Sequence, residues 1–193
     1  MSRNSEYSLT GKLLLAMPGL GDPRFYRAVI FMCAHDEKGA MGLVINHVLP
    51  GIEFSSLMDQ LKISSDIKFD MNKFKTPVMC GGPVEGARGF ILHSRDFNRK
   101  DTVPVGDFYG ITGTVEALKI IATGGGPNHL LFILGYAGWG PEQLDQEIQD
   151  NSWLVCDPDP AIIFHANPAE KWELAVQKLG FDPGRLSSES GRA

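Results

Sequence analysis

The sequence predicts an α+β fold, a single domain with a mostly antiparallel sheet and helices around it. Strand-like apolar segments outnumber helix-like ones, and the first of them are joined by short turns, as in hairpins, instead of alternating with helices. The length of 193 residues suits one domain, and no linker, repeat or low-complexity segment divides the chain. We therefore expect one domain over residues 1–193, with loosely held ends at residues 1–8 and about 182–193.

The N-terminal quarter has the pattern of strands joined by tight turns. Residues 13–17 form a short apolar run that ends in the proline- and glycine-rich turn 18–23. Two further apolar runs, 27–35 and 40–48, are rich in β-branched residues and are separated by four residues ending in Gly39. This spacing predicts a β-hairpin.

The middle of the chain predicts one helix and two more strands. Residues 54–61 place their apolar side chains on one side of a short helix. The polar residues 62–76 predict a surface excursion with room for an edge strand at 67–69. Strands are expected at 77–80 and 89–93, on either side of a glycine-rich turn.

The remaining residues predict a polar loop, four strands and three helices. Thr114, Pro141 and Asn167 are typical of helix N-termini, and the helices that they begin should end near residues 123, 150 and 179. The predicted loop covers 94–107, and the predicted strands cover 109–112, 129–135, 153–156 and 161–164.

The charge distribution argues against direct nucleic-acid binding. The formal net charge is −5, and residues 141–193 hold ten of the 23 acidic residues but four of the 18 basic ones. A DNA-binding protein gains affinity by neutralising phosphates with grouped basic side chains. The densest basic segments, 68–75 and 95–100, are interleaved with or bordered by aspartates, so neither forms a basic stripe.

The cysteines and the hydropathy predict a cytoplasmic protein without a membrane segment. Cys33, Cys80 and Cys156 are an odd number and far apart, which is typical of reduced thiols. The N-terminus lacks the apolar core of a signal peptide, and no segment approaches the roughly 18 apolar residues of a membrane helix.

No motif predicts a cofactor or a metal. Gly19-Leu20-Gly21 lacks the third glycine of a dinucleotide fingerprint, and Ala87-Arg88 stands where a phosphate-binding loop needs Lys and Ser or Thr. The spacing of the five histidines matches no metal site of established pattern. Trp139, between two glycines, is a candidate for stacking on a ligand, although a buried core position is the favoured interpretation.

Several segments, taken in order, resemble the YqgE/AlgH family of bacterial proteins. They are Asp22-Pro23-Arg24-Phe25, residues 39–46, 81–84, 88–93, 135–139 and 151–154. The resemblance implies a bifurcated, partly barrel-like sheet surrounded by helices. It implies no catalytic residues, and some members are labelled transcriptional regulators. The chain departs from the family pattern at Glu142, where relatives have glycine.

Six polar residues beside apolar or glycine-rich segments are predicted to line one surface region near the ends of neighbouring strands. They are Asp22, Arg24, His35, Asn46, Arg88 and His93. Together with Trp139 they are the candidate binding residues, and we assign no catalytic or metal-binding residue. We expect a regulatory or interaction protein that acts through a protein partner or a small ligand. An enzyme with a site built from scattered polar residues and a DNA-binding regulator are the alternatives, and a monomer is slightly favoured.

Overall fold

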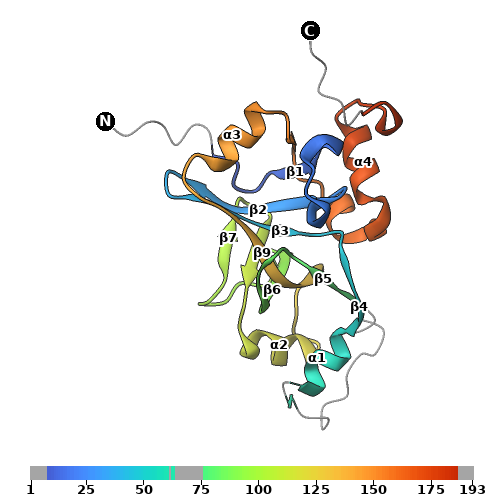
Figure 1. Cartoon of the computed structure of the whole chain (residues 1–193). Helices are drawn as coiled ribbons and strands as arrows, with labels where there is room; N and C mark the ends of the chain where they lie inside the picture. Colours follow the sequence, from blue (N-terminus) through green and yellow to red (C-terminus); the bar gives the residue numbers. More distant parts are fainter. Residues whose placement is uncertain (1–7, 61, 64–75, 187–193) are drawn as a thin grey trace.

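The computed structural model describes residues 8–60, 62–63 and 76–186, and it has the predicted α+β fold. Within these residues, ten strands form one curled sheet (Figure 1) in which all described pairings except β5–β9 are antiparallel. The path runs β10-β1-β2-β3-β9-β6-β8-β7, with β5 paired to β9 and β4 paired to β5. The strands are β1 (Leu13–Ala16), β2 (Val29–Asp36), β3 (Gly39–Val44), β4 (Val48–Glu53), β5 (Pro77–Cys80), β6 (Val84–Ser94), β7 (Val103–Val105), β8 (Tyr109–Thr112), β9 (Leu130–Trp139) and β10 (Trp153–Cys156).

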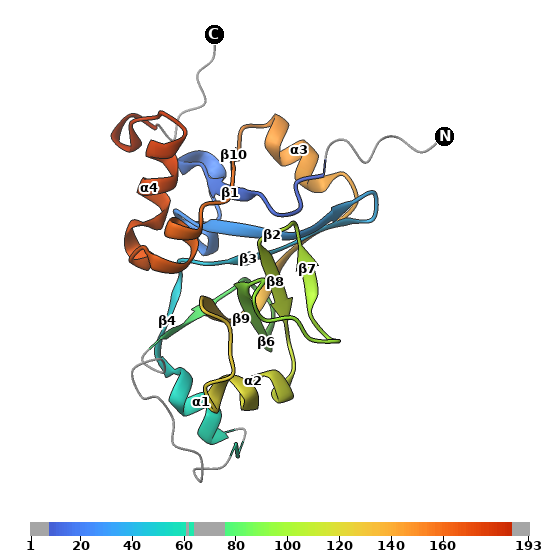
Figure 2. The same ribbon diagram turned by 180° about the vertical axis from the view of Figure 1, so that it is seen from behind.

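In the part of the chain that the structure describes, four α-helices flank the sheet at two places. The helices are α1 (Phe54–Gln60), α2 (Val115–Ala122), α3 (Gln143–Gln149) and α4 (Lys171–Lys178). Figures 1 and 2 show α1 and α2 together below β5, β6 and β9, whereas α3 and α4 lie beside β1 and β2 at the other end. No helix in the described part of the chain is long and apolar enough to cross a membrane.

Strand β9 is the point where the sheet branches. Its residues 132–134 pair in parallel with β5, whereas residues 137–139 pair antiparallel with β3. The change of partner falls at Gly135, whose φ is 76° and where a Cβ atom would lie 2.8 Å from the carbonyl oxygen of Gly82. Glycine is therefore needed for the branch, both for its left-handed backbone and for the close approach. This branching matches the bifurcated sheet that the family resemblance implies.

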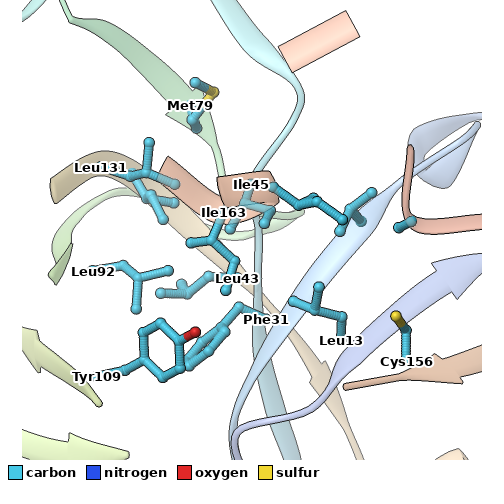
Figure 3. Packing of buried hydrophobic residues seen from close by; sticks show 14 of the residues in the cluster. Leu13, Phe31, Leu43, Ile45, Met79, Leu92, Tyr109, Leu131, Cys156 and Ile163 are labelled. Atoms are coloured by element: carbon cyan, nitrogen blue, oxygen red, sulfur yellow. The ribbon is translucent and has the colours of Figure 1, made fainter. Parts of the chain in front are cut away.

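Strand β1 is buried on both faces, which explains its unbroken apolar run. Leu13 and Leu15 belong to the largest buried cluster, which includes Trp172 of α4. Leu14 and Ala16 pack on the opposite face in a cluster that includes residues of α3 and β10. Figure 3 shows part of the largest cluster, with Phe31, Leu43 and Tyr109 pointing toward one another.

The structure corrects three predicted segments. Residues 161–164, predicted as a strand, form the π-helix Ala161–His165, because Pro160 adopts helical dihedrals and the side chain and carbonyl of Asp159 accept hydrogen bonds from Ala161 and Ile163. The predicted loop 94–107 contains β7, and the predicted strand 40–48 ends at Val44, with β4 beginning as a separate strand at Val48.

Two predictions fall partly or wholly outside the described residues. The edge strand expected at 67–69 lies there, as do most residues of the two predicted loose ends. Of the C-terminal end, residues 182–186 are described. They include the 3-10 turn Pro183–Arg185, and Leu186 packs against the largest buried cluster.

Candidate functional site

The connection between β1 and β2, residues 17–28, curves around a cavity of about 330 Å³ beside α4. This connection is the blue coil next to α4 in Figure 1. We call the cavity and its rim the loop cleft. Its lining residues are Ala16, Met17, Pro18, Leu20, Gly21, Asp22, Pro23, Phe25, Tyr26, Arg27, Trp172, Pro183 and Leu186.

The loop folds through two short 3-10 turns that its own sequence encodes. Each turn has proline at its first position, Pro18 in one and Pro23 in the other, where the missing N–H has no intrahelical partner. Gly21 separates the turns with a φ of 77°. Asp22 caps the second turn, because its carboxylate accepts a hydrogen bond from the Arg24 backbone N–H at 3.0 Å.

Asp22 and Arg24, two residues apart in the second turn, form a bidentate ion pair. Arg24 Nη2 lies 2.7 Å from Asp22 Oδ2, and Arg24 Nε lies 3.0 Å from Asp22 Oδ1. The Arg24 hydrogen bonds hold the pKa of Asp22 below its usual value, and the Asp22 carboxylate raises the pKa of Arg24. Both groups meet water, so the pair orients the two side chains and contributes little to stability.

The end of the loop is held by side chains that follow β3. Asn46 accepts a hydrogen bond from the Val29 N–H and donates one to the Arg27 carbonyl oxygen, both at 2.8 Å. His47 Nε2 donates to the carbonyl oxygen of Tyr26 at 2.9 Å. Between these contacts Arg27 has a φ of 48°, which is uncommon for a residue other than glycine. The surrounding hydrogen bonds therefore hold a strained backbone in place.

The floor of the loop cleft is the buried indole of Trp172. Its Nε1–H donates to the carbonyl oxygen of Ala16 at 2.9 Å. The Arg27 guanidinium lies over this ring, with Cζ 4.9 Å from the centroid, and its Nη1 is 2.9 Å from the carboxylate of Glu173. Tyr26, at the rim, is 69% exposed. The rim of the loop cleft therefore has an exposed tyrosine beside an arginine that packs on the buried Trp172 ring.

The other predicted binding residues lie elsewhere. His35, near the far end of β2, accepts the Leu9 N–H through Nδ1 at 3.2 Å and holds the N-terminal segment against the sheet. Trp139 is buried, and its Nε1–H donates to the Glu147 carboxylate at 2.9 Å, so the core interpretation holds. Arg88 is exposed on β6 and pairs with a neighbouring glutamate.

His93 is fully buried within β6. Its Nδ1 donates to the carbonyl oxygen of Ser94 at 2.8 Å, and its Nε2 lies 2.9 Å from the Thr112 hydroxyl. Burial lowers the pKa of His93, because the charged form loses its hydration. The neutral ring then accepts from Thr112, whose hydroxyl in turn lies 2.8 Å from that of Thr102.

The prediction that the six polar residues line one surface region is wrong. Asp22, Arg24 and Asn46 belong to the loop or hold it, but His35 lies six residues along β2 from Val29, about 20 Å away in an extended strand. His93 pairs with Leu130 at the start of β9, opposite the end that carries Trp139. The reason is that successive antiparallel strands run in opposite directions, so their C-terminal ends lie at opposite ends of the sheet. A position at the end of a strand is therefore not enough to place two side chains together.

Sequence reasoning missed the central residues of the loop cleft. Tyr26 and Arg27 stand where an apolar strand begins, and nothing in their sequence context indicates a left-handed backbone. Trp172 lies in the helix predicted to begin at Asn167, but the sequence does not show that this helix also forms the floor of a cavity.

Comparisons with known proteins agree with this fold. A family model described as AlgH-like matches residues 13–184. A UPF0301 protein from Rhodopseudomonas palustris (strain HaA2) is 48% identical over 189 residues, 96% of this chain and 87% of the relative. A UPF0301 protein from Ruegeria pomeroyi is also 48% identical, over 96% of this chain and 99% of the relative.

Two solved structures are similar as well. The solution structure of the AlgH protein from Pseudomonas aeruginosa is 36% identical, covers 100% of both chains and has a TM-score of 0.78. A crystal structure of a protein from Corynebacterium diphtheriae is 18% identical, covers 96% of this chain and 92% of that one, and has a TM-score of 0.70. At that identity the second match shows the fold alone.

Proposed function

The chain belongs to the AlgH-like family, and from the geometry of its loop cleft we propose that it is an interaction protein that binds a segment of a protein partner there. The observation that carries the proposal is that hydrogen bonds fix the backbone of Tyr26 and Arg27 at the rim. Both are exposed, yet hydrogen bonds from Asn46 and His47 hold their carbonyl groups in place. An exposed residue whose backbone is already held in place loses less conformational entropy when it binds.

The residue types favour a protein partner. Tyrosine, tryptophan and arginine dominate the energetically important positions of protein interfaces. The loop cleft combines Tyr26, Arg27 and Trp172 around a cavity large enough for an inserted side chain.

The same contacts disfavour DNA as the partner. Arg24 pairs with Asp22 and Arg27 pairs with Glu173, so each arginine of the loop already faces a carboxylate. Binding to phosphate would have to replace these contacts, whereas DNA-binding surfaces offer unpaired basic groups. We therefore propose a regulatory role through protein contact. The absence of disulfides among Cys33, Cys80 and Cys156 supports a cytoplasmic location for it.

The test is a quantitative pull-down from native lysate with the wild type and three variants. Tyr26→Ala removes the exposed ring, and Arg27→Gly removes the guanidinium while accommodating the left-handed backbone. Phe108→Ala is the matched control, because Phe108 is 73% exposed on the turn between β7 and β8.

We expect both loop variants to lose at least about tenfold in affinity for a captured protein, and the control to keep it. Equal capture by all four proteins, or loss only in Phe108→Ala, would show that the loop cleft is not the binding surface. Because a second copy of the chain can also be the partner, light scattering of the same variants distinguishes self-association from binding of a different protein.

A further inference from the structure

A second cavity, of about 370 Å³, lies between α1, α2 and the paired strands β6 and β9. We call it the apolar cavity. Its described lining residues differ from those of the loop cleft. Its lining residues are Leu57, Gln60, Ala87, Gly89, Phe90, Ile91, Gly113, Thr114, Val115, Leu118, Phe132, Ile133 and Leu134.

One wall of the apolar cavity exists because the β6–β9 ladder contains a large bulge. Val84 pairs with Tyr136 and Gly89 pairs with Leu134, so four residues of β6 lie opposite the single residue Gly135. Ala87, from this bulge, and Gly89, where pairing resumes, both line the cavity. Bulges of this kind redirect a strand and are common beside binding sites.

The lining defines the chemistry of the occupant. Among the described residues the lining has no charged side chain, and its polar side chains are those of Gln60 and Thr114. The Thr114 hydroxyl already donates to Asp101 and accepts from the Ala117 N–H. Several lining residues are exposed, namely Gln60, Ala87, Gly89, Gly113 and Val115, so the cavity opens to solvent on one side. A charged head group that enters the cavity finds no described lining side chain of opposite charge, whereas an apolar molecule removes apolar surface from water.

We propose that the apolar cavity binds an uncharged, apolar small molecule, such as a medium-length alkyl chain or a small aromatic compound. At about 30 Å³ for a water-sized group, the volume admits roughly twelve heavy atoms. This inference does not depend on the proposed function, because no residue of the loop cleft enters it.

The experiment titrates the full-length protein with 1-octanol and, separately, with octanoate, while backbone amides are followed by NMR. The two probes have the same chain length and differ in the charge of the head group. We expect 1-octanol to give saturable shifts at Gly89, Gly113 and Leu134, and octanoate to bind at least about tenfold more weakly.

Two variants narrow the apolar cavity. Ala87→Trp places an indole at the bulge, and Gly89→Val adds a side chain whose Cβ would lie 3.8 Å from Leu134, an ordinary contact distance. Ala169→Trp is the matched control, because Ala169 is an exposed alanine outside the cavity. Thermal unfolding identifies which variants fold, and the two routes to a smaller cavity keep the test usable if one of them does not.

The narrowed variants should bind 1-octanol at least about tenfold more weakly, and Ala169→Trp should bind within about twofold of the wild type. Three results would overturn the proposal. They are no saturable shift with 1-octanol, equal binding of octanoate, and shifts that persist unchanged when the cavity is narrowed.

Discussion

Asn46 donates a hydrogen bond from its side-chain amide to the carbonyl oxygen of Arg27, across 2.8 Å. Its amide oxygen accepts from the Val29 N–H at the same distance, so one side chain replaces two backbone partners at the point where the loop joins β2. Because Arg27 has a left-handed backbone, this link holds a conformation that its sequence alone disfavours. The shape of the loop cleft therefore depends on a residue that does not line it.

We expect Asn46→Ala to lower the free energy of unfolding by about 1–3 kcal/mol, because it leaves two backbone groups without their partners. Urea denaturation measures the change. Asn128→Ala is the control and should stay within about 0.5 kcal/mol, because the described contact of Asn128 is made by its backbone N–H. An unchanged stability of Asn46→Ala would mean that water replaces the amide without cost.

The sequence predicts most elements of the fold because their signals are local. Residues 13–17 are apolar on both faces, and the glycine-ended link before residue 40 predicts the hairpin that β2 and β3 form. The prediction of a strand at 161–164 was wrong, because a short apolar run fits a strand and a buried helical turn equally well. The hydrogen bond from the Ala161 N–H to the Asp159 carboxylate favours the helical turn, and the periodicity of the apolar residues gives no information about this contact.

The candidate site was predictable only in part, for a different reason. Asp22 caps the turn as a residue of its type should. That Asn46 reaches Arg27, however, depends on the register between β2 and β3, a non-local property. His93 was expected at a surface but lies in the core, because Thr112 on the neighbouring strand provides a polar partner that the sequence does not place.

Glu142→Gly should stabilise the protein. Glu142 precedes α3 with a φ of 60°, and its side chain makes no capping hydrogen bond. A residue with a Cβ is strained in this region, whereas glycine is not, so we expect a gain of about 0.5–1 kcal/mol. Thermal unfolding measures the effect.

Gln146→Gly, on the exposed side of the same helix, is the control for Glu142→Gly. Gln146 lies within the helix, so glycine there should destabilise the protein by about 1 kcal/mol. A loss of stability in both variants would indicate that the left-handed strain at Glu142 is small.

Lys171 should make stability rise with pH in the alkaline range. Its Nζ donates to the carbonyl oxygens of Ile45 and Ile163, and burial lowers its pKa to about 8. The unfolded chain has a lysine pKa near 10.4, so between the two values it binds more protons than the folded chain. Raising the pH from about 7.5 to about 9.5 should therefore favour folding by about 1–2 kcal/mol through this group.

Lys171→Met removes the titrating group and isolates this contribution. We compare the pH dependence of the two unfolding free energies, because other groups that titrate in this range affect both proteins equally. The difference between wild type and variant should move in favour of the wild type as the pH rises. A difference that does not change with pH would show that Lys171 has the same proton affinity in both states.

His93 should make the protein less stable in acid. Burial lowers its pKa in the folded chain, whereas the unfolded chain keeps the ordinary value of about 6.5. As the pH falls below about 6.5, the unfolded chain takes up a proton first, so folding loses up to about 1.4 kcal/mol per pH unit through this group. The charged ring would also lose its role as acceptor for the Thr112 hydroxyl, 2.9 Å away.

Urea denaturation at pH 7 and pH 5 measures this loss of stability, and His93→Gln should lose less between these pH values than the wild type. His165→Gln, at an exposed position, should follow the wild type. If instead His93→Gln and the wild type lose equal stability in acid, His93 becomes protonated within the fold, and the buried hydrogen-bond chain to Thr112 and Thr102 rearranges to accept the charge.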